Sequence, residues 1–264
     1  MRRPPAEIVS TIRVSYTPRV RKTTVFQWIF AGAVTLCLGI PFMVAGFLVP
    51  GLTRKGRVFR SLSKIYSRVL FAAFRVRVVR RGIERIDPRQ GYVFMANHIS
   101  IADPLAVAIA IDHPLHFVFK REFARIPVFG WALLSLGQIM VDREDREQAV
   151  GALAGAASGL SGNSSVIIFP EGWISRDGTL QPLKKGGFHL AIRTGMPIVP
   201  LRIEGARDVC PPGGSGHFHP GIVTVEAFPP IPVRGGTEEE IPALMESVKR
   251  FLVIPGSEPA GLPL

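Results

Sequence analysis

Cysteine is almost absent from this chain of 264 residues, which has two, Cys37 and Cys210, far apart in the sequence. Such a pair supplies neither a disulfide framework nor the spacing of a zinc site. The segment His217-Phe218-His219 places two imidazoles close together, but no carboxylate or cysteine joins them at ligand spacing, so no metal site is expected. The chain also lacks a Gly-x-Ser-x-Gly elbow, so a serine nucleophile of that kind is not expected.

Acidic side chains are scarce as well: 20 Asp and Glu against 32 Lys and Arg give a formal net charge of +12. This excess predicts an anionic partner, which can be a nucleic acid, a membrane surface or a phosphorylated substrate. The basic residues mostly flank an uncharged apolar run, and no nucleic-acid-binding module is visible. We therefore favour an anionic membrane surface over nucleic acid.

Charge is missing altogether from residues 26–52, a stretch long enough to cross a bilayer as one helix. Gly39-Ile40-Pro41 interrupts it near the middle, and basic residues occur on both flanks. Because basic flanks prefer the cytoplasmic side, we expect a kinked hairpin that dips into one leaflet; a single span and a buried soluble helix remain alternatives. Residues 1–25 are basic and lack a cleavage-site pattern, so they do not predict a signal peptide.

Residues 57–72 combine apolar side chains at helical spacing with arginine and lysine, which predicts a basic amphipathic helix on an anionic bilayer. The chain then divides into a basic segment (1–25), a membrane-associated helical segment (26–72), a folded domain (73–254) and a flexible tail (255–264). We expect the protein at the cytoplasmic face of the cell membrane. The apolar positions of the amphipathic helix are Val58, Leu62, Ile65 and Val69.

From residue 74 onward, short β-prone runs alternate with helical ones. This alternation predicts an α/β fold with a mainly parallel sheet flanked by helices. Helices are expected near residues 144–161 and around Leu244 to Leu252. The expected strands lie near Phe74–Val79, Tyr92–Ala96, Leu115–Phe119, Gln138–Val141, Ser165–Phe169, Ile198–Ile203 and Ile222–Phe228.

The segment Asn97-His98-Ile99-Ser100-Ile101-Ala102-Asp103-Pro104 lies between an expected strand and an Ala-rich apolar run. Asp103 suits the N-cap of a helix and Pro104 its first position, so His98 and Asp103 are predicted to share a short loop. A carboxylate that holds one imidazole nitrogen leaves the other nitrogen as a general base. That base would activate a hydroxyl or amine of the substrate; the alternative is a histidine that merely bonds to a helix cap.

Three further segments follow predicted strands, at the edge where open α/β sheets bind ligands. Arg143 can clamp a phosphate there or open an exposed helix. In the segment 169–172, Glu171 can orient Arg143 or a substrate hydroxyl, although Pro-Glu-Gly is also a common turn. The segment 182–188 is a basic turn whose amides and Lys184 suit an anion, and a plain surface turn would look the same.

In their order, the four segments resemble the motifs of the glycerolipid acyltransferase family, most closely the bacterial 1-acylglycerol-3-phosphate acyltransferases. The resemblance covers about residues 57–230. The matches are Asn97, His98 and Asp103 to Asn-His-x4-Asp; Gly137, Ile139 and Arg143 to Gly-x-Ile-x-Ile-x-Arg; Phe169, Pro170, Glu171, Gly172 and Ser175 to Phe-Pro-Glu-Gly-Thr-Arg-Ser; and Ile198 to Leu201 to a Val-Pro-rich strand.

The resemblance implies transfer of a fatty acyl group from acyl-CoA or acyl carrier protein to a lysolipid hydroxyl, without a cofactor. The most direct acceptor is 1-acylglycerol-3-phosphate, which gives phosphatidate in phospholipid biosynthesis. His98 would be the base and Asp103 its support. No oligomeric state is implied. The residues assigned to substrate binding are Asn97, Arg143, Glu171, Gly172, Trp173, Ser175 and Lys184.

The chain departs from the family pattern where Trp173-Ile174 replaces Thr-Arg. In the family that arginine is associated with the acceptor phosphate, so its loss removes a bidentate clamp while tryptophan adds apolar surface. One alternative is therefore an acyltransferase for another acceptor, such as lyso-ornithine lipid or another lysophospholipid. A second alternative, of a different class, is a non-catalytic, membrane-attached lipid-binding protein that does not depend on His98.

Overall fold

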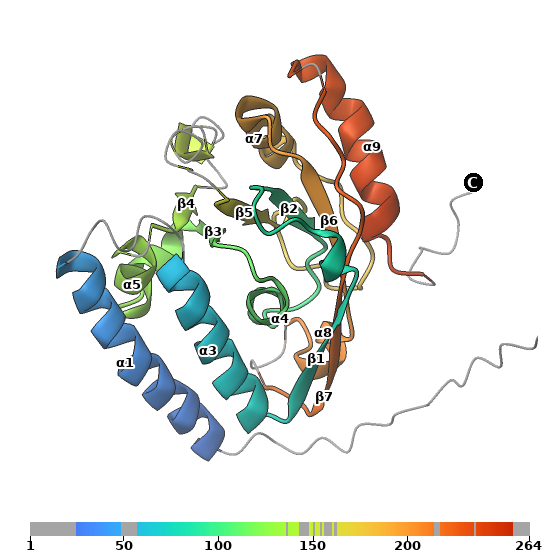
Figure 1. Cartoon of the computed structure of the whole chain (residues 1–264). Helices are drawn as coiled ribbons and strands as arrows, with labels where there is room; N and C mark the ends of the chain where they lie inside the picture. Colours follow the sequence, from blue (N-terminus) through green and yellow to red (C-terminus); the bar gives the residue numbers. More distant parts are fainter. Residues whose placement is uncertain are drawn as a thin grey trace, which may run out of the picture.

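In the computed structural model of this chain, a seven-stranded sheet lies between two layers of helices (Figure 1). The structure describes residues 25–48, 57–135, 137–142, 148–149, 151–153, 155, 160, 163–213, 217–234 and 236–255. The strands are β1 (Val76–Arg81), β2 (Val93–Ala96), β3 (Leu115–Lys120), β4 (Ile139–Val141), β5 (Ser165–Ile168), β6 (Ile198–Glu204) and β7 (Gly221–Ala227).

The helices and 3-10 turns alternate with these strands along the chain, as the sequence predicts. The α-helices are α1 (Val25–Leu48), α3 (Arg57–Ala73), α4 (Asp103–Ala110), α5 (Phe129–Ser135), α7 (Gly186–Thr194), α8 (Ala206–Val209) and α9 (Ile241–Leu252). The 3-10 turns are η1 (Ile83–Arg85), η2 (Arg121–Arg125) and η3 (Glu238–Glu240).

The strand order is β1-β7-β6-β2-β5-β3-β4, and every pairing except that of β6 with β7 is parallel. The predicted α/β fold with a mainly parallel sheet is confirmed. In the register, Met95 of β2 lies between Ile168 of β5 and Pro200 of β6. Because β2, β3, β4, β5 and β6 run in the same direction, their carboxyl ends share one edge of the sheet.

Side-chain alternation along the strands divides the core into two layers. Phe94 and Ala96 of β2 face the layer that includes α3, α4 and α8, whereas Val93 and Met95 face the layer of α7 and α9. All four side chains are fully buried. A central parallel strand covered on both faces explains why this run is apolar without interruption.

The predicted element boundaries agree with the structure to within one or two residues for all seven strands. The C-terminal helix is also present, and Pro242 lies in its first turn, where a missing N–H has no helical partner to lose. The predicted helix 144–161 lies partly outside the described residues, as do the basic N-terminal segment before Val25 and the tail after residue 255.

Helix α1 continues through Pro41 without a turn, so the kinked hairpin predicted within residues 26–52 is wrong for the described part of that stretch. Instead, α1 lies beside α3 (Figure 1), and the Thr35 and Tyr66 hydroxyls are 3.0 Å apart across the pair. Among the helices that the structure describes, none has the length and apolar character needed to cross a membrane.

The amphipathic face predicted for α3 is divided in the structure. Leu62 packs against the core, whereas Ile65 and Val69 are exposed. Lys64 of this helix forms an ion pair with Asp112 in the loop after α4. Arg80 of β1 binds the same carboxylate at 2.6 Å. These ion pairs tie α3 to the sheet layer.

Candidate active site

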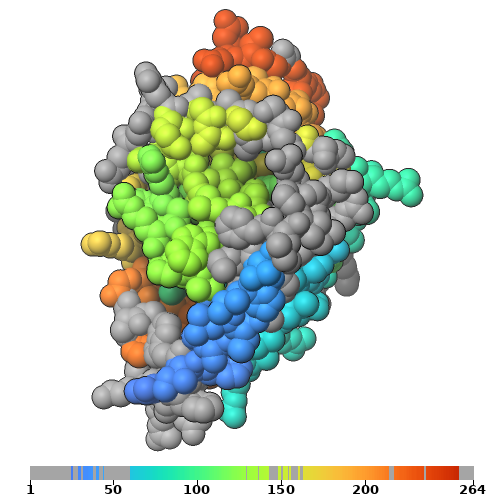
Figure 2. All heavy atoms as spheres, turned by 90° about the vertical axis from the view of Figure 1, so that its left-hand side faces the viewer, coloured from blue at the N-terminus to red at the C-terminus, as the bar shows by residue number. Residues whose placement is uncertain are grey.

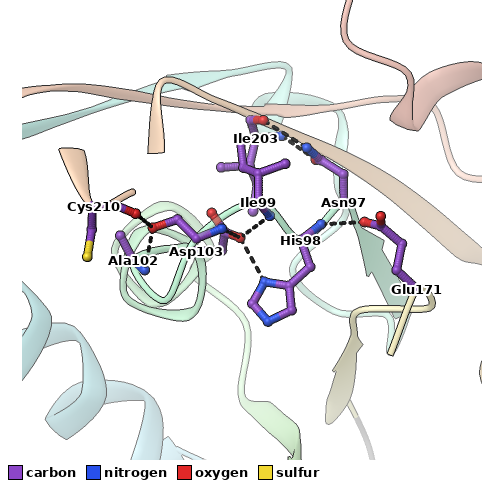
Figure 3. A network of polar contacts seen from close by, with 9 residues as sticks. Asn97, His98, Ile99, Ala102, Asp103, Glu171, Ile203 and Cys210 are labelled. Carbon is purple, nitrogen blue, oxygen red and sulfur yellow. Dashed lines mark hydrogen bonds and ion pairs between the residues drawn. The ribbon is translucent and has the colours of Figure 1, made fainter. Parts of the chain in front are cut away.

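The loop between β2 and α4 folds around the carboxylate of Asp103, which is completely buried. Its Oδ2 atom accepts three hydrogen bonds: from Nδ1 of His98 at 2.8 Å and from the amides of Ile99 and Ser100 at 2.7 and 2.8 Å (Figure 3). Because the carboxylate accepts from Nδ1, that nitrogen carries the proton and Nε2 keeps its lone pair. The predicted His98–Asp103 contact is confirmed.

Asp103 is not the N-cap that the sequence predicts. Helix α4 begins at Asp103 itself, its cap position is Ala102, and no side chain caps it. The reason is that Oδ2 turns back toward the preceding loop, where the imidazole and two amides bind it. Asp103 therefore fixes both the orientation of the imidazole and the shape of the loop that holds it.

The imidazole of His98 is held from a second side by the ring of Phe169, which follows β5. The two rings stack with centroids 4.2 Å apart and an interplanar angle of 24°. Only 11 % of the His98 side chain is exposed. Its Nε2 atom points away from Asp103 (Figure 3), so the nitrogen that is free to accept a proton is the one that the carboxylate does not hold.

The carboxylate of Glu171 joins two main-chain segments, and its predicted contact with a substrate stays a prediction. Its Oε1 accepts the amide of His98 at 2.6 Å and its Oε2 accepts the amide of Gln181 at 2.8 Å (Figure 3). The side chain is 2 % exposed, and this burial raises the pKa of Glu171 to about 7, although the two amides oppose the rise. Glu171 is a positioning residue for the His98 loop.

Asn97 and Ser175, both predicted to bind substrate, are buried and bind the protein itself. The side-chain amide of Asn97 donates a hydrogen bond to the carbonyl of Ile203 at 2.9 Å and accepts one from the Ile203 N–H at 2.7 Å. These two bonds join the end of β2 to β6. The main-chain N–H of Ser175 donates to the carbonyl of His98 at 2.7 Å, and its hydroxyl donates to the carbonyl of Thr179 at 2.7 Å. Both residues therefore join segments of the site, and their assignment to substrate binding stays a prediction.

The residues after β5 form the exposed edge of the site. Gly172 has φ of 78°, a left-handed backbone conformation that favours glycine, and the flexible side chain of Lys184 lies against it. Trp173 is 52 % exposed. The ammonium groups of Lys120 and Lys184 lie 5.3 and 5.7 Å from the centre of its ring. This edge is the cationic and aromatic rim of the site.

Lys120 was not predicted as a site residue, although its position at the carboxyl end of β3 is the kind of signal that identified the other segments. Its side chain also contacts Glu122 at 2.8 Å. Arg143, the predicted phosphate clamp, lies outside the described residues. Among those that are described, no group of three or more His, Cys, Asp or Glu side chains is arranged to hold a metal ion.

The site thus presents a buried histidine–carboxylate pair, a cationic rim and three loops joined by main-chain hydrogen bonds. Residues 77–204, which contain all of these, match the family model "Acyltransferase". The chain carries an acyltransferase domain. The family resemblance drawn from its motifs is confirmed.

Three proteins illustrate how far the similarity extends. The chain is 28 % identical to 1-acyl-sn-glycerol-3-phosphate acyltransferase alpha of Mus musculus, over 78 % of this chain and 73 % of the mouse protein. It is 31 % identical to the Homo sapiens protein of the same name, over 67 % and 63 %. The crystal structure of the 1-acyl-sn-glycerophosphate (LPA) acyltransferase PlsC from Thermotoga maritima matches with a TM-score of 0.68 at 26 % identity, over 85 % and 91 %.

Proposed function

We propose that this enzyme transfers a fatty acyl group to the free hydroxyl of 1-acylglycerol-3-phosphate and so produces phosphatidate. The names of the similar proteins from mouse, human and Thermotoga maritima all specify this acceptor. The acyl donor in the proposal is a thioester, either acyl-CoA or the acylated form of acyl carrier protein. No acyl-enzyme intermediate is required, because the histidine can activate the acceptor directly.

In the proposed reaction, Nε2 of His98 removes the proton from the acceptor hydroxyl as the oxygen attacks the thioester carbonyl. Asp103, at 2.8 Å from Nδ1, stabilises the imidazolium that forms. The new ester bond forms as the carbon–sulfur bond breaks, and the leaving thiolate takes the proton back from the imidazolium. The observation that carries the proposal is this buried pair, with Nε2 pointing away from the carboxylate (Figure 3).

The test is an acyl-transfer assay with the purified full-length protein, an acyl-CoA and a panel of lysolipids. We expect phosphatidate from lysophosphatidate and release of one thiol for each ester formed. A matched panel of lysophosphatidylcholine, lysophosphatidylethanolamine and lyso-ornithine lipid sets the background. Acylation of another member of the panel, with none of lysophosphatidate, would contradict the proposed acceptor and leave the acyl-transfer chemistry intact.

A second acceptor class is favoured by one observation, the sequence Trp173-Ile174 at the rim. The side chain of Ile174 has no hydrogen-bond donor where the family has an arginine, and the exposed Trp173 offers an apolar face. An acceptor with a zwitterionic or amino-acid head group, such as lyso-ornithine lipid, needs no guanidinium fork. The same panel decides between the two acceptors.

The proposal also includes a place for the reaction, the cytoplasmic face of the cell membrane, where both lipids lie. The net charge of +12 and the helix α3 with its exposed Ile65 and Val69 support it. The non-catalytic, lipid-binding alternative does not account for a buried histidine whose tautomer is set by a carboxylate.

A further inference from the structure

An apolar patch on the catalytic domain itself lies next to the site. Phe123, Ile126, Trp131 and Leu134 are 42, 43, 48 and 50 % exposed, and we call these four side chains the η2–α5 surface. They belong to η2, to the residue after it and to α5. The described part of the chain exposes fourteen large hydrophobic side chains. Four of them form this surface, and five more belong to α1.

The η2–α5 surface is continuous with α1. Helix α5 packs against α1, and Figure 2 shows the green residues of η2 and α5 beside the blue helix α1 on one face of the molecule. The inward side of α5 is ordinary core, since Ala132 and Leu133 are 8 and 5 % exposed. Trp131 and Leu134 are therefore not displaced core residues but the outer side of a helix whose inner side is already packed.

The turn that displays this surface is strained and tightly built. Val128 has φ of 63°, in the left-handed region that a β-branched residue rarely adopts. A Cβ on Gly130 would lie 2.4 Å from the carbonyl oxygen of Phe123, so η2 and α5 approach as closely as a glycine allows. Strain of this kind persists at functional positions, and here it holds apolar side chains toward solvent rather than in the core.

The charge around the surface indicates what covers it. Arg121 and Arg125 of η2 are exposed, and Arg121 lies 3.8 Å from the carboxylate of Asp142. Glu122, between the two arginines, contacts Lys120 at 2.8 Å, so the cationic side chains here outnumber the acidic ones. An apolar centre with a basic rim suits a layer that is anionic outside and apolar beneath. Trp131 suits the boundary between the two, because its ring is apolar and its indole N–H is polar.

We propose that the η2–α5 surface inserts into the head-group region of an anionic phospholipid leaflet. The catalytic domain then contacts the membrane directly, in addition to any contact made by the N-terminal helices. The role of this insertion in acyl transfer rests on the proposed function. Lys120, which precedes η2, lies 5.3 Å from the ring of Trp173, so the inserted surface adjoins the rim through which an acceptor would leave the leaflet for His98.

The direct test uses the fluorescence of Trp131 in the full-length chain after Trp28→Phe and Trp173→Phe, since the chain has 3 tryptophans. Vesicles of phosphatidylcholine and phosphatidylglycerol, with bromine on the acyl chains, are added. We expect a blue shift and quenching of Trp131 emission that weakens when phosphatidylglycerol is omitted or salt is raised. Emission unchanged by these vesicles would overturn the proposal, whatever the enzyme acylates.

Matched variants separate this surface from the rest of the molecule. Ile126→Ser and Leu134→Ser should each lower the vesicle partition coefficient roughly tenfold, because each removes a large apolar side chain from the leaflet. Ile222→Ser, at a position 57 % exposed on β7, is the control and should change it little. Equal effects of all three substitutions would contradict a local surface.

Two further measurements separate the membrane proposal from the proposed function and from other partners that could cover the η2–α5 surface. Acylation of a short-chain acceptor dissolved without membranes tests the chemistry alone, so a wild-type protein inactive in that assay argues against the function and not against the surface. Sedimentation without lipid tests a second copy of the chain. A dimer that Ile126→Ser and Leu134→Ser dissociate would mean that the surface is a protein interface, and the membrane proposal would be wrong.

Discussion

Oδ2 of Asp103 binds the imidazole of His98 and two loop amides at once, so this one atom has an electrostatic and a structural role. The same division appears at Glu171, whose two oxygens bind main-chain amides and whose position determines where His98 lies. Single substitutions at these two residues can therefore separate the charge of the side chain from the shape of the loop.

Asp103→Asn should lower kcat roughly 10²-fold or more, because it removes the charge that stabilises the imidazolium and can favour the wrong tautomer of His98. The amide oxygen of asparagine still accepts from the loop amides, so the fold should persist. Steady-state kinetics measures kcat, and thermal unfolding checks that the variant is folded. A change of only a few-fold in kcat would mean that Asp103 chiefly shapes the loop.

Glu171→Gln should remove a pH dependence from the stability of the protein. The pKa of Glu171 is about 7 in the fold against an ordinary 4.5, so the folded state holds this proton more tightly than the unfolded chain. The stability that the protonated carboxyl contributes is complete below pH 4.5 and is lost as the pH rises through 7. The shift corresponds to about 3 kcal/mol, and glutamine does not titrate.

The measurement is the free energy of unfolding of both proteins from acid to mildly alkaline pH. Wild type should lose stability relative to Glu171→Gln across that window, by up to about 3 kcal/mol, since other titrating groups cancel in the difference. Stability curves that stay parallel would show that the carboxyl has an ordinary pKa in the fold.

At the scale of elements, the sequence predicts what is local and misses what is distant. The His98 loop was predicted because a buried strand and an Ala-rich helix bracket it within a few residues. The contacts of Glu171 with His98 and of Asn97 with Ile203 span 73 and 106 positions. No spacing rule reaches that far, so the sequence does not predict that these side chains join distant segments of the main chain.

The loop after β5 is the element that should determine the acceptor. Trp173→Thr together with Ile174→Arg restores the family pattern and adds a guanidinium fork for a phosphomonoester. The double variant should improve kcat/KM for lysophosphatidate relative to other lysolipids by roughly 10- to 100-fold, the effect of about 1.5–3 kcal/mol from one charge-assisted hydrogen bond.

The control for this prediction is the ratio between acceptors in one enzyme preparation, which cancels differences in active fraction. Lys184→Met in the unaltered chain should move the ratio in the opposite direction, because it removes one of the two ammonium groups above Trp173. An unchanged ratio in the double variant would show that the residues at 173 and 174 do not select the acceptor.

For the whole molecule, the sequence predicted the fold class and the edge of the sheet that holds the site, because alternating apolar runs specify a covered parallel sheet. It did not predict the straight course of α1 through Pro41. A proline in a long apolar run weakens a helix, but packing of α1 against α3 and α5 offsets that cost, and packing partners are not visible in one sequence.

The central claim is that His98 is the general base of acyl transfer, and His98→Ala tests it most directly. The measurement is kcat/KM for phosphatidate formation by the full-length variant, with thermal unfolding and vesicle binding as controls. The account predicts a loss on the order of 10³-fold in a variant that still folds and binds vesicles, because the imidazole is the proton acceptor. The lost stacking on Phe169 and the lost bond to Asp103 should lower the unfolding temperature without unfolding the protein. Activity close to that of wild type in a folded, vesicle-binding variant would contradict the account.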